Sequence, residues 1–303
     1  MLRIASIGEC MIELSDTAAA DGGMRRTFGG DTLNTAVYLA RSLRDSAAEV
    51  HYVTALGDDP FSDEMLAGWQ AEGVNTGLVV RLPGRLPGLY IIRTAASGER
   101  SFHYWRSAAA ARELLCDGRP ETLADGLAGF DLVYLSGITL AILEGESRER
   151  LLTLLARLRD GGVRIAFDTN YRPRLWPDRA TAQEAVARTL RFADVALPTF
   201  EDEATLFGDP DPEATAVRLH GLGVGEVAVK RGGEPCLISL EGRQAWVPGE
   251  SVAHPVDTTA AGDSFNAAYL AARLTGETAE VAARAGHRLA ARVIATRGAI
   301  VPA

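Results

Sequence analysis

The sequence predicts an α/β protein whose mainly parallel central sheet is flanked by helices on both faces. Short apolar runs rich in Ile, Val and Tyr recur along the chain, and each ends at Gly, Pro, Asn or Asp. Segments of helical periodicity lie between these runs. Because strand, helix and strand in repetition are typical of βαβ units, most strands should be parallel. A chain of 303 residues with 47% hydrophobic residues can bury a large core, and we expect one domain over residues 1–303.

The βαβ pattern can be followed along most of the chain. The apolar runs predict strands over residues 2–8, 50–57, 132–137, 163–170, 194–198 and 226–232. The periodic segments predict helices over residues 31–44, 147–160, 181–193 and 212–222. In a sheet of this kind ligands bind beyond the carboxyl ends of the strands, so functional residues are expected there.

Residues 78–106 interrupt the alternation. Two strand-like runs, around 89–94 and 100–105, are joined by ASGE at 96–99 with no helix between them, which is typical of a hairpin. With the runs ECMIEL and MRRTF they predict a small β-sheet lid over a cleft, its strands drawn from about 9–28 and 78–106. A decorated edge of the main sheet fits the pattern equally well.

Charge and cysteine usage restrict the class of protein. A net charge of −9 argues against a nucleic acid or an acidic membrane as partner, because either requires a basic face. The three cysteines are widely separated, with no CxxC pair and no partnering cluster of histidines, which disfavours a zinc site or disulfides and fits a reducing compartment. The N-terminal residues do not resemble a signal peptide, and no run of about 18 apolar residues occurs. The sequence therefore predicts a cytoplasmic protein.

The stretch DTTAAGDSFNAAYLAARL, residues 257–274, predicts an anion site at a helix start near Ala261. The first amides of a helix lack partners, and the small residues before them allow a phosphate to approach. Asp263 lies in the first turn, where the helix dipole should lower its pKa. A carboxylate there can orient and deprotonate an alcohol during phosphoryl transfer. A plain capping carboxylate is the alternative interpretation.

DTTAAGDSFNAA resembles the C-terminal signature of the ribokinase-like (PfkB) carbohydrate kinases, whose usual form is DTTGAGD. Ala260 stands where that family usually has Gly, and we expect the backbone at 260 not to need a positive φ. FGGDTLNTAVYLARSL at 28–43 resembles the family's sugar-binding element, and GDDPFSDEM at 57–65 resembles its GxD-x-FG segment. The matches keep the family's order and run through nearly the whole chain.

The resemblance implies roles for residues of this chain. Asp263 would be the catalytic base, with the amides of Ala261, Gly262 and Asp263 holding the γ-phosphoryl group, while Gly30 and Asn34 would meet the sugar hydroxyls. HYWR at 103–106, GLYIIRT and FDTNYRPRLW at 167–176 resemble the 2-keto-3-deoxygluconate kinases within the family. Guanidinium groups suit a carboxylate, and a protein of this charge must supply them locally. The implied substrate contacts are Tyr90, Tyr104, Arg106 and Arg172.

VKRGGEP at 229–235 corresponds to the family's loop beneath ATP. Many relatives carry Asn-x-x-Glu where this chain has Thr199 and Asp202, so Asp202 is the candidate for Mg²⁺, through water. A monovalent cation is a further expectation. For Lys230, a solvated strand end is the alternative. The implied nucleotide contacts are Asn170, Arg172, Lys230, Arg231, Gly232, Gly233, Ala260, Ala261 and Gly262.

The resemblance thus implies ATP-dependent phosphorylation of 2-keto-3-deoxygluconate at its 6-hydroxyl, and we expect a homodimer or higher homo-oligomer joined through the lids. A fructokinase or another neutral-sugar kinase is the nearest alternative. A non-catalytic sugar- or nucleotide-binding regulator is a more remote one. A dinucleotide-dependent dehydrogenase is disfavoured, because no G-x-G-x-x-G follows the first strand.

Overall fold

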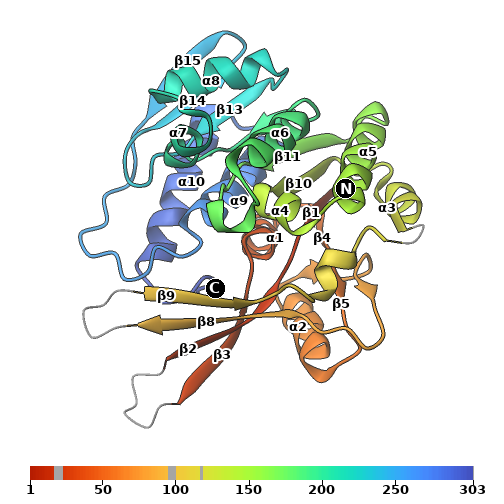
Figure 1. Cartoon of the computed structure of the whole chain (residues 1–303). Helices are drawn as coiled ribbons and strands as arrows, with labels where there is room; N and C mark the ends of the chain where they lie inside the picture. The colour runs from red at the N-terminus through yellow and green to blue at the C-terminus, as the bar shows by residue number, and fades with distance from the viewer. Residues whose placement is uncertain (17–22, 95–99, 117–118, 303) are drawn as a thin grey trace.

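A nine-stranded sheet forms the centre of the molecule in a computed structural model, which describes residues 1–16, 23–94, 100–116 and 119–302 (Figure 1). The strand order is β15-β14-β13-β12-β11-β10-β1-β4-β6. The predicted α/β class with a mainly parallel sheet is confirmed. The strands are β1 (Leu2–Ile7), β4 (Ala48–Val53), β6 (Val74–Asn75), β10 (Leu132–Ser136), β11 (Arg164–Asp168), β12 (Val195–Ala196), β13 (Glu226–Val229), β14 (Cys236–Leu240) and β15 (Arg243–Val247).

The sheet is parallel from β6 to β13 and antiparallel from β13 to β15. The six predicted strands lie in its parallel part, although Ala55–Leu56 forms a separate strand, β5, outside this sheet. Sequence analysis did not predict β14 and β15, which join the sheet as an antiparallel edge. Since β1, β10, β11 and β13 run in one direction, their carboxyl ends lie at the same edge.

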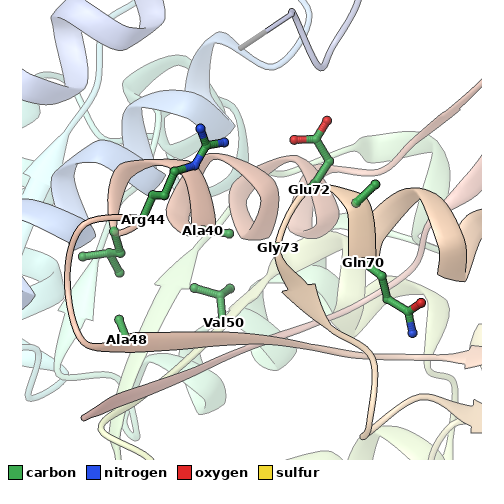
Figure 2. A pocket seen from close by; sticks show the side chains of 9 residues that line it. Ala40, Arg44, Ala48, Val50, Gln70, Glu72 and Gly73 are labelled. Atoms are coloured by element: carbon green, nitrogen blue, oxygen red, sulfur yellow. The ribbon is translucent and has the colours of Figure 1, made fainter.

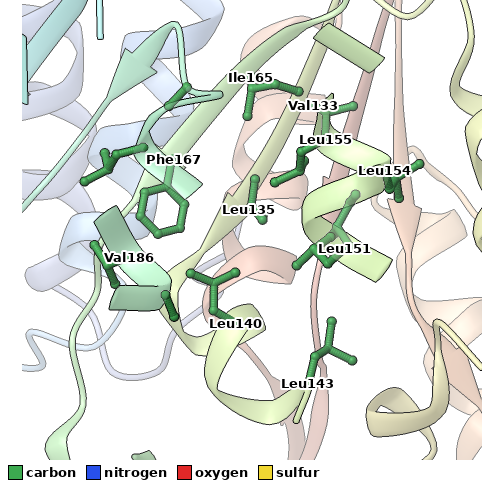
Figure 3. Close-up of a cluster of buried hydrophobic side chains, with 14 of the residues drawn as sticks. Val133, Leu135, Leu140, Leu143, Leu151, Leu154, Leu155, Ile165, Phe167 and Val186 are labelled. Carbon is green, nitrogen blue, oxygen red and sulfur yellow. The ribbon is translucent and has the colours of Figure 1, made fainter. Parts of the chain in front are cut away.

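Helices cover both faces of the sheet, so each strand buries side chains on two sides (Figure 1). On one face, Val133 and Leu135 of β10 and Ile165 and Phe167 of β11 lie against Leu151, Leu154 and Leu155 of α5 (Figure 3). The helices of this face are α3 (Arg119–Leu127), α4 (Gly137–Ile142), α5 (Glu146–Asp160), α6 (Arg179–Leu190), α7 (Phe200–Phe207) and α8 (Pro212–Gly221), with 3₁₀ turns at Ala110–Glu113 and Pro173–Leu175. Those of the other are α1 (Asp31–Ser42), α2 (Pro60–Ala71), α9 (Ala261–Leu274) and α10 (Ala279–Ile294).

The four predicted helices are present as α1, α5, α6 and α8, with ends shifted by a few residues. Local capping explains several starts: the side chains of Asp59, Asp178 and Asp211 accept hydrogen bonds from the first amides of α2, α6 and α8. None of the helices in the described part of the chain is long and apolar enough to cross a membrane.

A separate four-stranded sheet projects from the body of the molecule (Figure 1). Its order is β3-β2-β8-β9, from β3 (Met24–Gly29), β2 (Met11–Asp16), β8 (Gly88–Thr94) and β9 (Arg100–Trp105). The small second sheet is therefore confirmed, and the decorated-edge alternative is wrong. Residues 80–81 do not join it, because β7 (Val80–Arg81) pairs with β5 (Ala55–Leu56). The predicted ASGE turn lies outside the described residues.

Candidate active site

Two helices begin at the carboxyl edge of the sheet and bring their first turns together. Asn34 in the first turns of α1 donates from Nδ2 to Oδ2 of Asp263 in the first turn of α9, at 2.8 Å. Thr35 also donates to the backbone carbonyl of Asp263, at 3.3 Å. The two motifs singled out in the sequence, 229 residues apart, thus form one site.

Two amides at the start of α9 have no hydrogen-bond acceptor in the described chain. Gly262 and Asp263 donate no hydrogen bond to any described residue. Ala261 does donate, to the carbonyl of Thr258 at 3.2 Å, so the expectation that all three amides are free is wrong. The tight turn that starts the helix uses the first amide and leaves the next two without an acceptor in the described structure.

Ala260 has φ +62° and ψ +14°, in the left-handed region. The expectation that this position does not need a positive φ is therefore wrong. The turn closed by Thr258 and Ala261 requires the left-handed conformation, which an alanine adopts at a cost of about 1–2 kcal/mol.

Asp263 does not cap its helix, and its pKa is raised to about 7. The cause is first burial, then the negative charge of Asp31; the hydrogen bond from Asn34 and the charge of Lys230 act in the opposite direction. The predicted lowering by the helix dipole is wrong, because desolvation and a neighbouring carboxylate outweigh it. A carboxyl group with this pKa is well matched to accept a proton near neutral pH.

Lys230 is buried beneath the start of α9. Its Nζ donates to Oδ2 of Asp168 at 2.7 Å and to Oδ1 of Asn266 at 2.9 Å. Asn266 Nδ2 in turn donates to Asp168 at 2.6 Å and to the hydroxyl of Tyr134 at 3.1 Å. A Cβ atom added to Gly262 would lie 3.5 Å from Nζ. With only 6% of its surface exposed, Lys230 is not a solvated strand end, and that interpretation is wrong.

Asp31 is a third carboxylate at this edge. Asn170, at φ +35°, donates from Nδ2 to Oδ2 of Asp31 at 2.7 Å and from its amide to Oδ1 of Asp168 at 3.1 Å. Burial raises the pKa of Asp31, while hydrogen bonds from Ser136 and Asn170 lower it. Asn170 therefore ties the end of β11 to the first turn of α1.

The loop after Lys230 contains three further predicted contacts, Arg231, Gly232 and Gly233. The guanidinium of Arg231 lies over the ring of Trp246, 5.5 Å from its centroid, and its buried Nε has no partner among the described residues. Gly232 has φ +57°, and a Cβ added to Gly232 or Gly233 would meet open space. Backbone can thus be approached closely here.

Arg172 and Asp202 face each other on the rim of the site. Arg172 Nη1 donates to the carbonyl of Tyr171 at 2.8 Å and lies 3.3 Å from Oδ2 of Asp202. Burial raises the pKa of Asp202, and the charge of Arg172 partly offsets this. The described part of the chain contains no cluster of three or more metal-binding side chains. Mg²⁺ commonly takes one or two carboxylates and completes its shell with phosphates and water, which Asp202 fits.

The second sheet contributes two tyrosines. Tyr90 of β8 is buried and donates a short hydrogen bond to Glu13 of β2. Burial and the charge of Glu13 raise the pKa of Tyr90. Tyr104 of β9 stacks on Tyr90 at 5.7 Å between centroids and is 50% exposed. The two stacked rings thus extend from the buried part of the second sheet to its solvent-exposed side.

Arg106 and Gly30 lie where the second sheet joins the body. Arg106 Nη2 donates to the buried carboxylate of Glu9, so this guanidinium is already paired. Gly30 precedes α1, and a Cβ there would overlap the carbonyl oxygen of Glu9. Only glycine permits this close approach.

Sequence analysis missed several residues of this site. Asp31 lies inside the quoted GGD motif and Asp168 inside FDTN, but no role was assigned to either. Asn266 follows Asp263 by less than one turn. Their position at strand ends and helix starts was the available signal. The pairing of Asp168 with Lys230 required the fold.

A pocket of about 400 Å³ lies elsewhere, at the opposite end of α1 from Asn34 (Figure 2). The ends of α1 and α2 and the start of β4 line it, including Arg44, Val50 and Gln70. Glu72 on its wall is paired with Arg41 at 2.7 Å. It contains none of the groups assembled at the carboxyl edge.

Residues 1–303 match the model of the pfkB family carbohydrate kinases. The chain belongs to the PfkB family of carbohydrate kinases. The 2-dehydro-3-deoxygluconokinase of Dickeya dadantii is 51% identical, over 99% of this chain and 97% of that protein. The fructokinase of Vibrio alginolyticus is 29% identical, over 89% of this chain and 84% of that protein.

Solved structures of PfkB-type kinases share the fold. The 2-dehydro-3-deoxygluconokinase of Thermotoga maritima aligns with a TM-score of 0.85 at 23% identity, over 99% of this chain and 96% of that one. A putative ribokinase II of E. coli, in complex with ATP and Mg²⁺, aligns with a TM-score of 0.83 at 22% identity, over 99% and 94%. The ribokinase-like architecture is therefore confirmed.

We expect Ala260→Gly to stabilise this kinase by up to about 1.5 kcal/mol. Relief of the left-handed alanine, roughly 1–2 kcal/mol, exceeds the greater chain entropy that glycine loses on folding, roughly 0.5–1 kcal/mol. Chemical denaturation measures the difference. Ala261→Gly, one residue into α9, is the matched control and should destabilise instead. A less stable Ala260→Gly variant would contradict the argument.

We expect the kcat/KM of this PfkB kinase to fall as pH decreases through about 7, because protonation neutralises Asp263, the predicted catalytic base. Each further pH unit should cost about tenfold. Asp31→Asn removes a neighbouring negative charge and should move this acidic limb to lower pH. Initial rates in a buffer series, with coupling enzymes in excess, provide the measurement. An unshifted limb in the variant would show that Asp31 does not set the pKa.

Proposed function

We propose that this PfkB kinase transfers the γ-phosphoryl group of ATP to the 6-hydroxyl of 2-dehydro-3-deoxygluconate, the compound also called 2-keto-3-deoxygluconate. The observation that carries the chemistry is the first turn of α9, where Asp263 follows directly after Gly262, the amides of both residues have no partner in the described structure, and the ammonium of Lys230 lies close to Gly262. The substrate is supported by the Dickeya dadantii enzyme of that name, which matches this chain at 51% identity over nearly the full length of both.

In this proposal one group of residues accepts the proton of the hydroxyl and another stabilises the transferred phosphoryl group. The hydroxyl oxygen forms the new bond to phosphorus, the bond to the bridging oxygen of ADP breaks, and the proton passes to Asp263. Asn34 orients that carboxylate, and its buried Oδ1, unpaired in the described structure, can accept from a sugar hydroxyl. The amides of Gly262 and Asp263, with the α9 dipole and Lys230, stabilise charge on the phosphoryl group.

ATP would lie along the loop after β13 and the rim residues. In this proposal Arg231, Gly232 and Gly233 approach the nucleotide, with Ala260 and Ala261 shaping the turn beside its phosphates. Asn170 and Arg172 face the γ-phosphate. Mg²⁺ neutralises phosphate charge when bound, and Asp202 would hold it through water. A monovalent requirement is a further expectation, to be measured as the rate in K⁺ against a bulky organic cation.

The substrate carboxylate would be held by Arg106, with Tyr90 and Tyr104 offering hydroxyls and Gly30 its backbone. Arg172 is a second candidate, since half of its side chain is exposed beside the site. We also propose that residues 1–303 act as one domain, with the β3-β2-β8-β9 sheet as the lid that excludes water from the transferred group.

The exposed side chains of the lid support a homodimer. Met24, Tyr104 and Trp105 are apolar or aromatic and solvent-exposed on this sheet. Pairing of two lids would bury them. Sedimentation velocity tests this, and a monomer at micromolar concentration would exclude it. A cytoplasmic location is the expected setting, in line with the ATP requirement and three free cysteines.

A coupled ADP-release assay with a panel of sugars and sugar acids tests the function. We expect 2-dehydro-3-deoxygluconate to give the highest kcat/KM. Asp263→Asn should lower kcat by about 10²- to 10⁴-fold, the usual contribution of general base catalysis, and leave the fold and ATP binding intact. Higher kcat/KM on fructose would assign the alternative, a neutral-sugar kinase. No turnover with any sugar would support a non-catalytic binding protein.

Recognition of the carboxylate can be tested at Arg106. We expect Arg106→Gln to lower kcat/KM for the sugar acid by about 10- to 100-fold, the range for hydrogen bonds to charged groups. The neutral matched substrate is 3-deoxyfructose, which differs only in having CH₂OH in place of the carboxylate. Equal losses on both compounds would show that Arg106 does not bind the carboxylate.

A further inference from the structure

Glu9 lies where the chain passes between the central sheet and the lid. The chain enters the lid after β1, leaves it at Gly30, re-enters at Gly88 and leaves again at Arg106. The first passage contains Glu9 itself. These four passages form the root of the lid.

Each of the other three passages contacts Glu9. Arg106 Nη2 donates to its Oε2. A Cβ added to Gly88 would lie 2.8 Å from its Oε1, and one added to Gly30 would overlap its carbonyl oxygen. Glu9 is thus the residue around which the root of the lid is assembled.

The ion pair is buried and only partly satisfied. Glu9 is 3% exposed, and burial raises its pKa while the charge of Arg106 lowers it. Arg106 Nε is buried without a partner in the described structure, as is Oε1 of Glu9. Leaving a buried polar atom unpaired costs free energy. A hydrogen bond from the Arg106 guanidinium to a further acceptor would therefore be favourable.

We propose that Glu9 is a positioning residue: it fixes the Arg106 guanidinium, through Nη2, in the orientation that presents its remaining N–H groups to the substrate carboxylate. The inference rests on the proposed function. A carboxylate neighbour weakens the net pull of Arg106 on an anion, but paired recognition of a carboxylate depends on how the planar guanidinium is oriented. An arginine held in place also loses less side-chain entropy when substrate binds.

The test measures discrimination, the ratio of kcat/KM for 2-dehydro-3-deoxygluconate to that for 3-deoxyfructose. Glu9→Gln should lower this ratio about tenfold, chiefly through KM for the acid, with KM for ATP unchanged. Glu9→Asp keeps the charge but shortens the reach, and should give an intermediate ratio. The Glu9→Asp variant also provides the measurement if the Glu9→Gln variant does not fold.

Glu226→Gln is the matched control for losing a buried Glu–Arg pair. Glu226 is buried in β13 and bonded by Arg273 at 2.8 and 2.9 Å, away from the site. It should lower the melting temperature without changing discrimination. If Glu9→Gln does only the same, or lowers kcat/KM equally for both substrates, the positioning role is overturned.

A double-mutant cycle separates action through Arg106 from direct contact with the sugar. If Glu9 acts through Arg106, Glu9→Gln should change discrimination little in the Arg106→Gln background. A full tenfold effect in that background would overturn the proposal. Failure of the proposed function gives a different result: wild-type enzyme would not prefer the acid, or Arg106→Gln alone would leave discrimination intact.

Discussion

The buried ammonium of Lys230 is the interaction on which the site depends. Three carboxylates, those of Asp31, Asp168 and Asp263, gather at one edge of the sheet, and a transferred phosphoryl group adds more negative charge. Lys230 pairs directly with Asp168 and lies beneath the first turn of α9. It is the only lysine of the sequence, in which all other basic side chains except the histidines are arginines. A compact point charge fits between Asp168, Asn266 and the helix, where a planar guanidinium would need more room and more acceptors.

The same charge arrangement explains why Asp263 suits its proposed role. A carboxylate of ordinary acidity would be a weak base at neutral pH, whereas crowding by Asp31 and loss of water raise its pKa to about 7. Asn34 keeps it oriented, and Asn170 links Asp31 to the strand that ends in Asp168. The proposed base, anion site and sugar-binding element are therefore parts of one polar network. A charge change at one carboxylate is expected to shift the pKa of the others.

Periodicity and strand-end punctuation were enough to predict the parallel sheet and four of its covering helices, because these depend on local patterns. The same patterns predicted a hairpin over residues 89–105 but left open whether it belongs to a separate sheet or to the edge of the main one. That Asp263 and Asn34 would share one site was implied by the resemblance to the PfkB kinases, and the structure joins them by a hydrogen bond. Three properties could not be predicted locally. The pKa of Asp263 depends on burial and on Asp31, the burial of Lys230 depends on a partner 62 residues away, and the φ of Ala260 depends on the turn that closes onto Thr258. Each is set by tertiary contacts that a propensity rule does not contain.

The strained start of α9 is held from outside the helix. Asp257 accepts from the amide and hydroxyl of Thr259 at 3.0 and 2.6 Å, and from the amide of Gly298 at 3.0 Å. These bonds fix the turn to the segment that follows α10. Because the turn is held there, Ala260 can remain in a left-handed conformation and Ala261 can close onto Thr258. The next two amides then have no acceptor in the described structure. The strain at Ala260 and the free amides of the next residues thus have the same cause, the turn that is held by Asp257. Because the turn is held from outside the helix, α9 can start without a side-chain cap.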